Sequence, residues 1–241
     1  MKFISAKSED SEWGPIADLM SGLMMVFLFI SVSYMLNVKN EKDNIEKEKN
    51  KMREVAVEYN RLQTDLYNDL KIEFENDLKK WGAVLDKKTL SVRFEEPEIL
   101  FDAGRFEIKK KFREILDDFF PRYIKRIYDE KYRNDIAEIR IEGHTSSEWQ
   151  YKATASEAYF FNMELSQNRT RAVLHYVLTD IYFDKDVEEW IKKTTTANGL
   201  SSSKLLFNDN DEEDKIKSRR VEFRVRTNSE ERIVKILEIG E

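Results

Sequence analysis

Residues 16–36 read IADLMSGLMMVFLFISVSYML, and this stretch decides how the chain is organised. The run from Leu19 to Leu36 carries no charge, and about 18 such residues suffice to suggest a membrane-crossing helix. A cleaved signal peptide fits poorly, because the preceding residues carry no net positive charge and no small-x-small cleavage site follows. A buried soluble helix is less favoured, since the run is apolar all round. The sequence therefore predicts a retained transmembrane helix at residues 16–36.

The segments on either side of this helix are polar. A short tail, residues 1–15, ends in Gly14-Pro15, and proline suits the first turn of a helix. Residues 37–80 are highly charged and contain no glycine or proline. Their apolar residues recur mostly three or four positions apart, at Ile45, Met52, Val55, Tyr59, Leu62, Leu66, Leu70, Phe74 and Leu78. This stripe predicts one long helix, and both a parallel coiled-coil stalk and an amphipathic helix lying on its own domain fit it.

Residues 81–241 alternate between strand-like and helix-like patterns. Ile139 and Ile141 alternate with Arg140 and Glu142, as in a half-buried strand. The expected strands are Leu90–Phe94, Ile136–Glu142, Lys192–Ala197 and Val221–Arg226, and the expected helices are Lys109–Asp129, Ser156–Ile181 and a short one near Glu230–Ile239. Strands separated by helices require a sheet that helices cover on at least one face. We therefore predict an α+β chain with a single N-terminal transmembrane helix, a helical stalk and a β-α-β-α-β domain with a mixed sheet.

The composition excludes several classes of function. Charged residues make up 37% of the chain, the net charge is -6, and the two signs are interleaved, so there is no basic patch for nucleic acid. Cysteine is absent, which excludes disulfides and thiolate metal sites. The two histidines, His144 and His175, lie far apart in the sequence, so we expect no metal site. The chain contains no nucleophile–base pair and no glycine-rich phosphate loop, and we predict that it is not an enzyme.

Asp18 lies at the start of the apolar run. A carboxylate that enters a bilayer is costly unless it meets a partner, a water-filled path or a proton. Ser21 lies three residues on, on the same face of the helix, where its hydroxyl can hydrogen-bond the carboxylate or help to coordinate a cation. Asp18 can therefore carry an ion through the membrane. It can equally sit at the membrane interface and reach water, and the residues alone leave both interpretations open.

The charges that flank the helix do not agree on its orientation. Lys2 and Lys7 precede the helix, whereas a larger group of lysines follows it within about 15 residues. Counted alone, that excess places the large domain in the cytoplasm. However, acidic residues are interleaved with those lysines, and long domains are translocated largely regardless of flanking charge. The orientation therefore has to follow from what the domain is.

The membrane segment resembles that of a known family of motor subunits. Residues 13–34, WGPIADLMSGLMMVFLFISVSY, look like the membrane helix of MotB-type stator subunits, in which an aspartate precedes Leu or Phe, then Met, then Ser or Thr. In that family the aspartate carries a proton or a sodium ion through the stator. The matching position here is Asp18, followed by Leu19, Met20 and Ser21. The resemblance implies that Asp18 carries the ion and that Ser21 supports the ion path.

Four further stretches resemble the OmpA-like peptidoglycan-binding domain, over about residues 90–228. They are FDAGRF (101–106), IRIEGHTS (139–146), NMELSQNR (162–169) and SRRVEFRV (218–225), in the family's order. An arginine offers a two-pronged fork for a stem-peptide carboxylate, and the resemblance assigns that role to Arg169. The other residues that it assigns to the peptidoglycan site are Asn162, Leu165, Ser166, Thr145, Ser146 and Arg219, while Gly143 and His144 are expected to shape the site.

The sequence departs from the OmpA-like pattern at one point of the site. The family has an acidic residue directly after its His-Thr pair, where it holds the ammonium group of diaminopimelate. That position is Ser146 here, and the segment 147–161 that follows is longer than usual. Two outcomes stay open: Glu148 or Glu157 supplies the missing carboxylate, or the site binds peptidoglycan in an altered way or weakly. For His144, at the end of a strand, we expect a ring that hydrogen-bonds the backbone.

Together the two resemblances imply that the chain is a subunit of a motor. It is a stator subunit anchored to peptidoglycan in the bacterial inner membrane, crossing once, with its N-terminus cytoplasmic and its C-terminal domain, residues 81–241, periplasmic. Two copies, a homodimer, are expected inside a ring of five multi-span subunits of the MotA/ZorA type, and no cofactor beyond the translocated proton or sodium ion. The wording of both motifs resembles the stators of the Zorya anti-phage defence system more than flagellar MotB. A flagellar stator and a passive OmpA/Pal-type tether are the alternatives.

Overall fold

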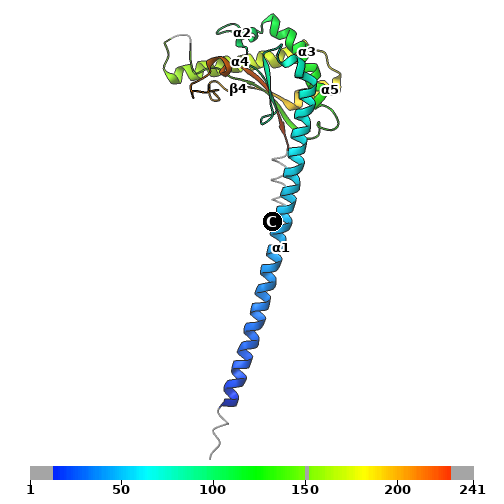
Figure 1. Ribbon diagram of the computed structural model, residues 1–241, viewed down its shortest axis with the longest axis vertical. Coiled ribbons are helices and arrows are strands. Elements are labelled where there is room, and N and C mark those ends of the chain that lie inside the picture. The colour runs from blue at the N-terminus through cyan, green and yellow to red at the C-terminus, as the bar shows by residue number, and fades with distance from the viewer. Residues whose placement is uncertain (1–12, 150–151, 229–241) are drawn as a thin grey trace, which may run out of the picture. The chain divides into compact units, whose positions relative to one another are not determined.

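The computed structural model describes residues 13–149 and 152–228 (Figure 1). Most of the predicted N-terminal tail, residues 1–12, and the short helix expected near Glu230–Ile239 lie outside the described residues. Structural statements that follow therefore concern the two described ranges.

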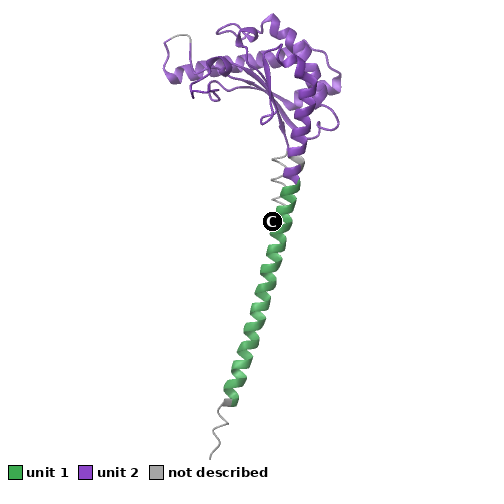
Figure 2. Ribbon diagram, in the orientation of Figure 1, with its two compact units in different colours: residues 1–54, 235–241 green, residues 55–234 purple. Residues whose placement is uncertain are grey.

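The chain forms two compact units (Figure 2). One consists of residues 1–54 and 235–241, and the other consists of residues 55–234. Helix α1 (Trp13–Leu78) is 66 residues long and contributes residues to both units.

The first unit contains the apolar part of α1. Among the described residues, α1 is the one helix long and apolar enough to cross a membrane, with a mean hydropathy of 2.1 over its most apolar window and none of that window buried. Leu23 is 69% exposed and Phe29 is 77% exposed. Water-soluble surfaces rarely present so many apolar side chains together, so this segment needs lipid or protein around it.

The second unit takes up the C-terminal part of α1. Leu66, Leu70 and Phe74 are fully buried in its hydrophobic core, and Leu62 and Leu78 pack against that core. All five belong to the apolar stripe. This part of the stripe therefore forms an amphipathic helix lying on its own domain, one of the two arrangements that the sequence allows.

The domain boundary differs from the one that the sequence predicts. The sequence predicts a stalk at residues 37–80 and a domain from residue 81, whereas the second compact unit begins at Val55. The physical reason is burial, because the stripe residues whose burial the structure describes have core partners only from Leu62 onward. Ile45, at the N-terminal end of the same stripe, is 59% exposed.

Ion pairs also hold α1 to helix α3 (Lys110–Ile127) within this unit. Arg122 donates through Nε to Glu73 Oε1 at 2.7 Å and through Nη1 to Asp77 Oδ2 at 3.0 Å. Arg126 pairs with the same Glu73. Burial tends to raise the pKa of Glu73, but the hydrogen bonds from both arginines outweigh it and hold that pKa below its usual value. We call these four residues, Glu73, Asp77, Arg122 and Arg126, the Arg122 clamp.

The second unit is built on one five-stranded sheet. Its strands are β1 (Ala83–Asp86), β2 (Ser91–Phe94), β3 (Ile136–Gly143), β4 (Thr195–Gly199) and β5 (Val221–Thr227). They lie in the order β1-β2-β5-β3-β4, with β3 and β4 parallel and every other neighbouring pair antiparallel. The predicted α+β class with a mixed sheet is therefore confirmed.

The helices that accompany the sheet are α2 (Pro97–Leu100), α3, α4 (Ala155–Thr179), α5 (Lys185–Thr194) and α6 (Lys215–Ser218). Helices α3 and α4 match the two long helices that the sequence predicts, whereas β1, α2, α5 and α6 are not predicted. The prediction of a strand at Lys192–Ala197 is wrong for residues 192–194. Residues up to Thr194 form the last turn of α5, so β4 begins only at Thr195.

The sheet has one apolar face and one charged face. In β5, Val221 and Phe223 are buried, while Arg224 and Arg226 on the opposite face are partly exposed. Helix α3 packs on the apolar face, where the rings of Phe119 and Phe223 lie 5.1 Å apart. This alternation is the one that a sheet covered on one face requires.

Leu70→Ala tests the packing of α1 against the domain. We expect it to lower the free energy of unfolding by roughly 2–5 kcal/mol, because it leaves a cavity in a fully packed core. The matched change Ile45→Ala removes a side chain that is largely exposed and should cost less than about 0.5 kcal/mol. Denaturant unfolding of the full chain in detergent, followed by tryptophan fluorescence, measures both. Equal losses of unfolding free energy in the two variants would show that α1 is not part of the domain core.

Candidate functional site

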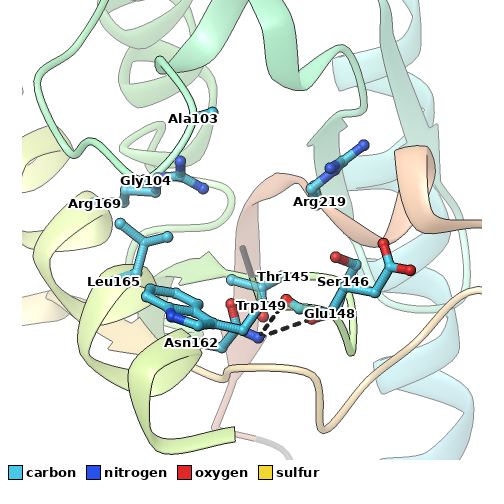
Figure 3. Close-up of a pocket in the computed structure, with 10 residues that line it drawn as sticks. All are labelled: Ala103, Gly104, Thr145, Ser146, Glu148, Trp149, Asn162, Leu165, Arg169 and Arg219. Atoms are coloured by element: carbon cyan, nitrogen blue, oxygen red, sulfur yellow. Dashed lines mark hydrogen bonds between the residues drawn. The ribbon is translucent and has the colours of Figure 1, made fainter. Parts of the chain in front are cut away.

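One cavity in the second unit gathers most of the residues that the motifs single out (Figure 3). Its volume is about 170 Å³. It is lined by Ala103, Gly104, Thr145, Ser146, Glu148, Trp149, Asn162, Leu165, Arg169 and Arg219. These residues come from the loop after α2, the loop after β3, the middle of α4 and the position directly after α6. Four motifs that are distant in the sequence therefore meet at one place.

Asn162 shapes the loop after β3. Its side chain is buried, and Nδ2 donates to the backbone oxygens of Ser146 at 3.2 Å and Glu148 at 3.0 Å (Figure 3). Ser147, between these two residues, donates its backbone N–H to Glu213 Oε1 at 2.9 Å. Asn162 thus fixes the backbone of the loop that forms one wall of the cavity.

Arg169 organises the loop that carries the FDAGRF motif. Its Nε donates to the backbone oxygen of Arg105 at 2.8 Å, and its Nη2 donates to that of Asp102 at 3.1 Å. The guanidinium also lies over the ring of Phe101, 4.9 Å from the ring centroid. Gly104, with φ at +67°, makes the tight turn that brings both carbonyls to one side chain. Within the described residues, no hydrogen bond is formed by Nη1 of Arg169, which leaves a donor for a ligand.

Positive charge dominates the cavity. Burial, and then repulsion from Arg219, lowers the pKa of Arg169 to about 10, so its guanidinium stays protonated at neutral pH. Arg219 itself is exposed at the rim. Two guanidiniums facing one small cavity favour an anionic ligand, and carboxylates match the fork of an arginine.

Thr145 offers a second polar group to the cavity. Its backbone N–H donates to the oxygen of Ser201 at 2.9 Å. Its side chain is buried, and Oγ1 has no hydrogen-bond partner among the described residues. A buried hydroxyl without a partner is costly, so a ligand or water that bonds Thr145 would remove a penalty.

The carboxylate that the family has next to its His-Thr pair is absent at Ser146, which is buried in the cavity wall. Of the two glutamates that the sequence offers instead, Glu148 lines the cavity and pairs with Lys215. Glu157 does not line it. Its side chain accepts from the N–H of Thr154 at 2.8 Å and forms the capping box at the start of α4.

Two of the predicted residues act behind the cavity. Ser166 Oγ donates to the oxygen of Met163 at 3.0 Å and accepts from the N–H of Ser201 at 3.1 Å, and it does not line the cavity. Gly143 permits the close approach of β3 to α4. A Cβ at Gly143 would lie 2.7 Å from Thr170 Cγ2 and 2.9 Å from the oxygen of Ser166.

His144 differs from the expectation in one respect. Its backbone N–H donates to the oxygen of Arg220 at 3.0 Å, but neither ring nitrogen has a hydrogen-bond partner within the described residues. Nε2 lies 3.6 Å from Glu222 Oε1 and 3.8 Å from Glu142 Oε2. Burial, followed by the charges of Arg220 and Arg224, lowers the pKa of His144 to about 3, so the ring is neutral. The main chain, and not the ring, makes the contact expected of His144.

The three side chains Glu142, His144 and Glu222 each offer one metal-ligand atom, and these atoms lie within 4.8 Å of one another. Arginines already supply positive charge there. Arg220 Nε donates to Glu222 Oε1 at 2.6 Å, and Arg224 Nη1 lies 3.9 Å from Glu142 Oε2. Because the guanidiniums take the role that a cation would have, the prediction of no metal site stays our expectation.

The neutral state of His144 predicts a dependence of stability on pH. The unfolded chain takes up a proton at His144 near pH 6.5, whereas the folded chain does so only near pH 3. Stability should therefore fall as pH is lowered from 6.5, by up to about 1.4 kcal/mol per pH unit from this group. His144→Asn should remove that slope between pH 6.5 and 5. The free energy of unfolding, measured with denaturant at each pH, checks this. Parallel curves for wild type and variant would mean that the pKa of His144 is not lowered in the folded chain.

The membrane residues lie in the first unit. Asp18 is exposed on α1, and Ser21 Oγ donates to the backbone oxygen of Ala17 at 2.8 Å. The hydroxyl proton of Ser21 is therefore directed to its own helix and not to Asp18. Its oxygen keeps a lone pair with which it can accept or coordinate.

Sequence reasoning missed three residues of the cavity, Ala103, Gly104 and Trp149. Gly104 lies within the FDAGRF motif, and a glycine in a short polar loop between two elements is the signal that finds it. Trp149 lies in the unusually long segment 147–161, where no pattern in the sequence assigns it to the cavity.

Comparison with known proteins gives one close relative and several distant folds. No protein-family model matches the chain. Zorya protein ZorB from Escherichia coli (strain Crooks) is 48% identical over 238 residues, which cover 98% of this chain and 97% of that protein. Similar solved structures include a MotB-like protein from Desulfovibrio vulgaris, 24% identical with a TM-score of 0.47, covering 72% of this chain and 94% of that chain. The periplasmic domain of Helicobacter pylori MotB is 19% identical with a TM-score of 0.39, covering 61% and 83%.

The likeness to the Escherichia coli protein spans nearly the whole of both chains. It includes the apolar helix as well as the domain that holds the cavity. At almost half identity over that length, this chain belongs to the ZorB family of Zorya proteins.

Proposed function

We propose that this chain is a peptidoglycan-anchored stator subunit of an ion-driven motor in the bacterial inner membrane, acting in anti-phage defence. The observation that supports this most is the cavity in which Arg169, Arg219, Thr145 and Ser146 converge. Membership of the ZorB family supports the motor and the defence role. The same membership confirms the prediction that the chain is not an enzyme.

The cavity has the chemistry of a carboxylate receptor. Stem peptides of peptidoglycan carry carboxylates, and a carboxylate in this cavity would meet Nη1 of Arg169 and the guanidinium of Arg219. The hydroxyl of Thr145, which has no hydrogen-bond partner among the described residues, adds a third donor. Charge-assisted hydrogen bonds of this kind are roughly twice as strong as neutral ones, so a small cavity suffices to hold a ligand that is presented many times on a polymer.

The apolar helix supplies the other half of the proposal. Asp18 is the carboxylate of that helix and carries the translocated proton or sodium ion. One helix cannot enclose an ion path, so the motor needs a multi-span partner of the MotA/ZorA type around a homodimer of this chain. The domain lies in the periplasm and the N-terminus in the cytoplasm, because peptidoglycan lies outside the inner membrane.

Co-sedimentation with purified peptidoglycan sacculi tests the anchoring. We expect the full chain in detergent to sediment with intact sacculi, and soluble stem peptides to release it. Sacculi stripped of their stem peptides by an amidase should retain much less protein. Equal retention on stripped sacculi, or no retention of folded protein on intact ones, would contradict peptidoglycan binding through this cavity.

Co-purification tests the motor. The chain should be recovered from membranes together with a multi-span subunit in a fixed ratio. Recovery of a lone monomer from gently solubilised membranes would count against a stator.

Glu148→Gln tests whether this glutamate replaces the acidic residue that OmpA-like domains have at the position of Ser146. We expect about two- to fivefold weaker binding of stem peptides that carry a free ammonium group, because the carboxylate at the rim is half-exposed and its ion pair is correspondingly weak. Ser146→Asp, added to the variant, should restore binding. Glu157→Gln is the matched control, since glutamine preserves the capping box. Unchanged affinity in Glu148→Gln would remove this residue from the site.

A passive tether would use the same cavity. It has no use for Asp18, however, so a substitution at that position separates the two proposals.

A further inference from the structure

The mouth of the cavity carries an aromatic surface that the proposed carboxylate site does not use. The rings of Trp149 and Phe161 lie 5.2 Å apart with an interplanar angle of 31°. Phe161 is 43% exposed. Leu165 is one turn further along α4 and lines the cavity together with Trp149 (Figure 3). We call Trp149, Phe161 and Leu165 the aromatic rim.

The aromatic rim is continuous with the cavity. Phe161 and Leu165 are four residues apart in α4, so they lie on the same face of the helix. Asn162, between them in sequence, is the buried residue that holds the loop before Trp149. A ligand whose charged end reaches Arg169 therefore has the rim directly beside it.

The rim suits a sugar ring better than a protein partner. Aromatic faces are electron-rich and attract the partly positive edges of a neighbouring group, and the C–H face of a pyranose offers such a surface while its hydroxyls stay in water. A stable protein interface needs about 800 Å² from each partner, far more than two partly exposed rings provide. In peptidoglycan, the stem peptide is attached to a glycan strand, so a peptide in the cavity brings a sugar to its mouth.

We infer that Trp149 and Phe161 stack on a sugar of the glycan strand, so that the site recognises a sugar-linked peptide and not the peptide alone. This inference rests on the proposed binding of peptidoglycan. It gives Trp149 and Phe161 a role, because the loop after β3 places Trp149 in the cavity wall and α4 places Phe161 beside that ring.

Titration of the full chain in detergent with two ligands tests the inference. One ligand is a disaccharide-tetrapeptide of peptidoglycan, and the other is the same tetrapeptide without sugar. We expect the wild-type chain to bind the sugar-linked ligand about five- to tenfold more tightly. Phe161→Leu keeps an apolar side chain but removes the flat ring, and it should lose this difference while its affinity for the free peptide is unchanged. Phe160→Leu is the matched control, since Phe160 is 69% exposed on α4 and its ring lies against Tyr159, with ring centroids 5.8 Å apart.

Each outcome has a separate meaning. Loss of the sugar preference in Phe161→Leu but not in Phe160→Leu supports the inference. Equal wild-type affinity for both ligands overturns it and leaves peptidoglycan binding intact. Failure of the folded chain to bind either ligand overturns the proposed function, and the inference with it. A sedimentation coefficient that shows self-association lost in Phe161→Leu, without a sugar preference in the wild type, assigns the rim to a second copy and also overturns it.

Discussion

Asp18→Asn is expected to abolish ion flux through the assembled motor and, with it, protection against phage. Asparagine has nearly the same shape as aspartate but cannot take up and release a proton, and it cannot neutralise a sodium ion. An uncharged amide is also easier to place in a bilayer than a carboxylate, so the amount of protein in the membrane should not fall. Flux into liposomes that contain the chain and its multi-span partner, and phage plating on cells, measure the two effects.

The control for this substitution is Ser21→Ala. The hydroxyl of Ser21 already donates to the oxygen of Ala17, so its removal should leave a proton flux nearly intact. A marked loss in Ser21→Ala, restricted to sodium-driven flux, would identify sodium as the ion. Full flux and full protection in Asp18→Asn would eliminate Asp18 as the ion carrier and favour a passive tether.

Arg169→Lys is expected to weaken binding to sacculi by tenfold or more, even though the positive charge is kept. A lysine is a point charge on a flexible stem and lacks the planar fork. Its three donors lie on a single nitrogen, so they cannot reproduce the geometry in which separate nitrogens of Arg169 bond the oxygens of Arg105 and Asp102. Because the loop at 101–106 then loses its brace, the shape of the cavity changes although its charge does not. Co-sedimentation with sacculi across a range of protein concentrations measures the loss of affinity.

Arg171→Lys is the matched control for this prediction. Arg171 is exposed on the same helix and does not line the cavity, so its affinity for sacculi should equal that of the wild type. Thermal unfolding separates the two effects of Arg169, since the brace contributes to stability and the ligand contact does not. Wild-type affinity in Arg169→Lys would mean that the ligand does not use the fork.

Much of this fold could be predicted because its signals are local. The alternation of Ile139 and Ile141 with charged neighbours marks β3, and an uncharged run marks the apolar helix. The extent of the domain could not be predicted in the same way. Ile45 and Leu66 belong to one stripe in the sequence, yet one is largely exposed and the other is fully buried. What separates them is a tertiary partner, which periodicity does not report.

The site shows the same limit. Arg169, Thr145 and Arg219 could be predicted to lie together, because each belongs to a motif, and all three line the cavity. The partners of Arg169 could not be, since they are backbone oxygens that any residue supplies. The engagement of Glu157 at the start of α4 could also be predicted from the sequence. Thr154-x-x-Glu157 is a capping-box pattern, and it indicates that this carboxylate is engaged at a helix start.

The Arg122 clamp has a mechanical consequence. Leu66, Leu70 and Phe74 are buried along one side of α1, and the clamp adds ion pairs at Glu73 and Asp77 beside them. A pull along the axis of this helix loads all of these contacts at the same moment, in shear. A pull across the axis would open them one after another, as a zipper opens. Tension that enters the domain through α1 is therefore shared by the whole contact, and the force needed to break it is set by the sum of the contacts and not by the weakest one.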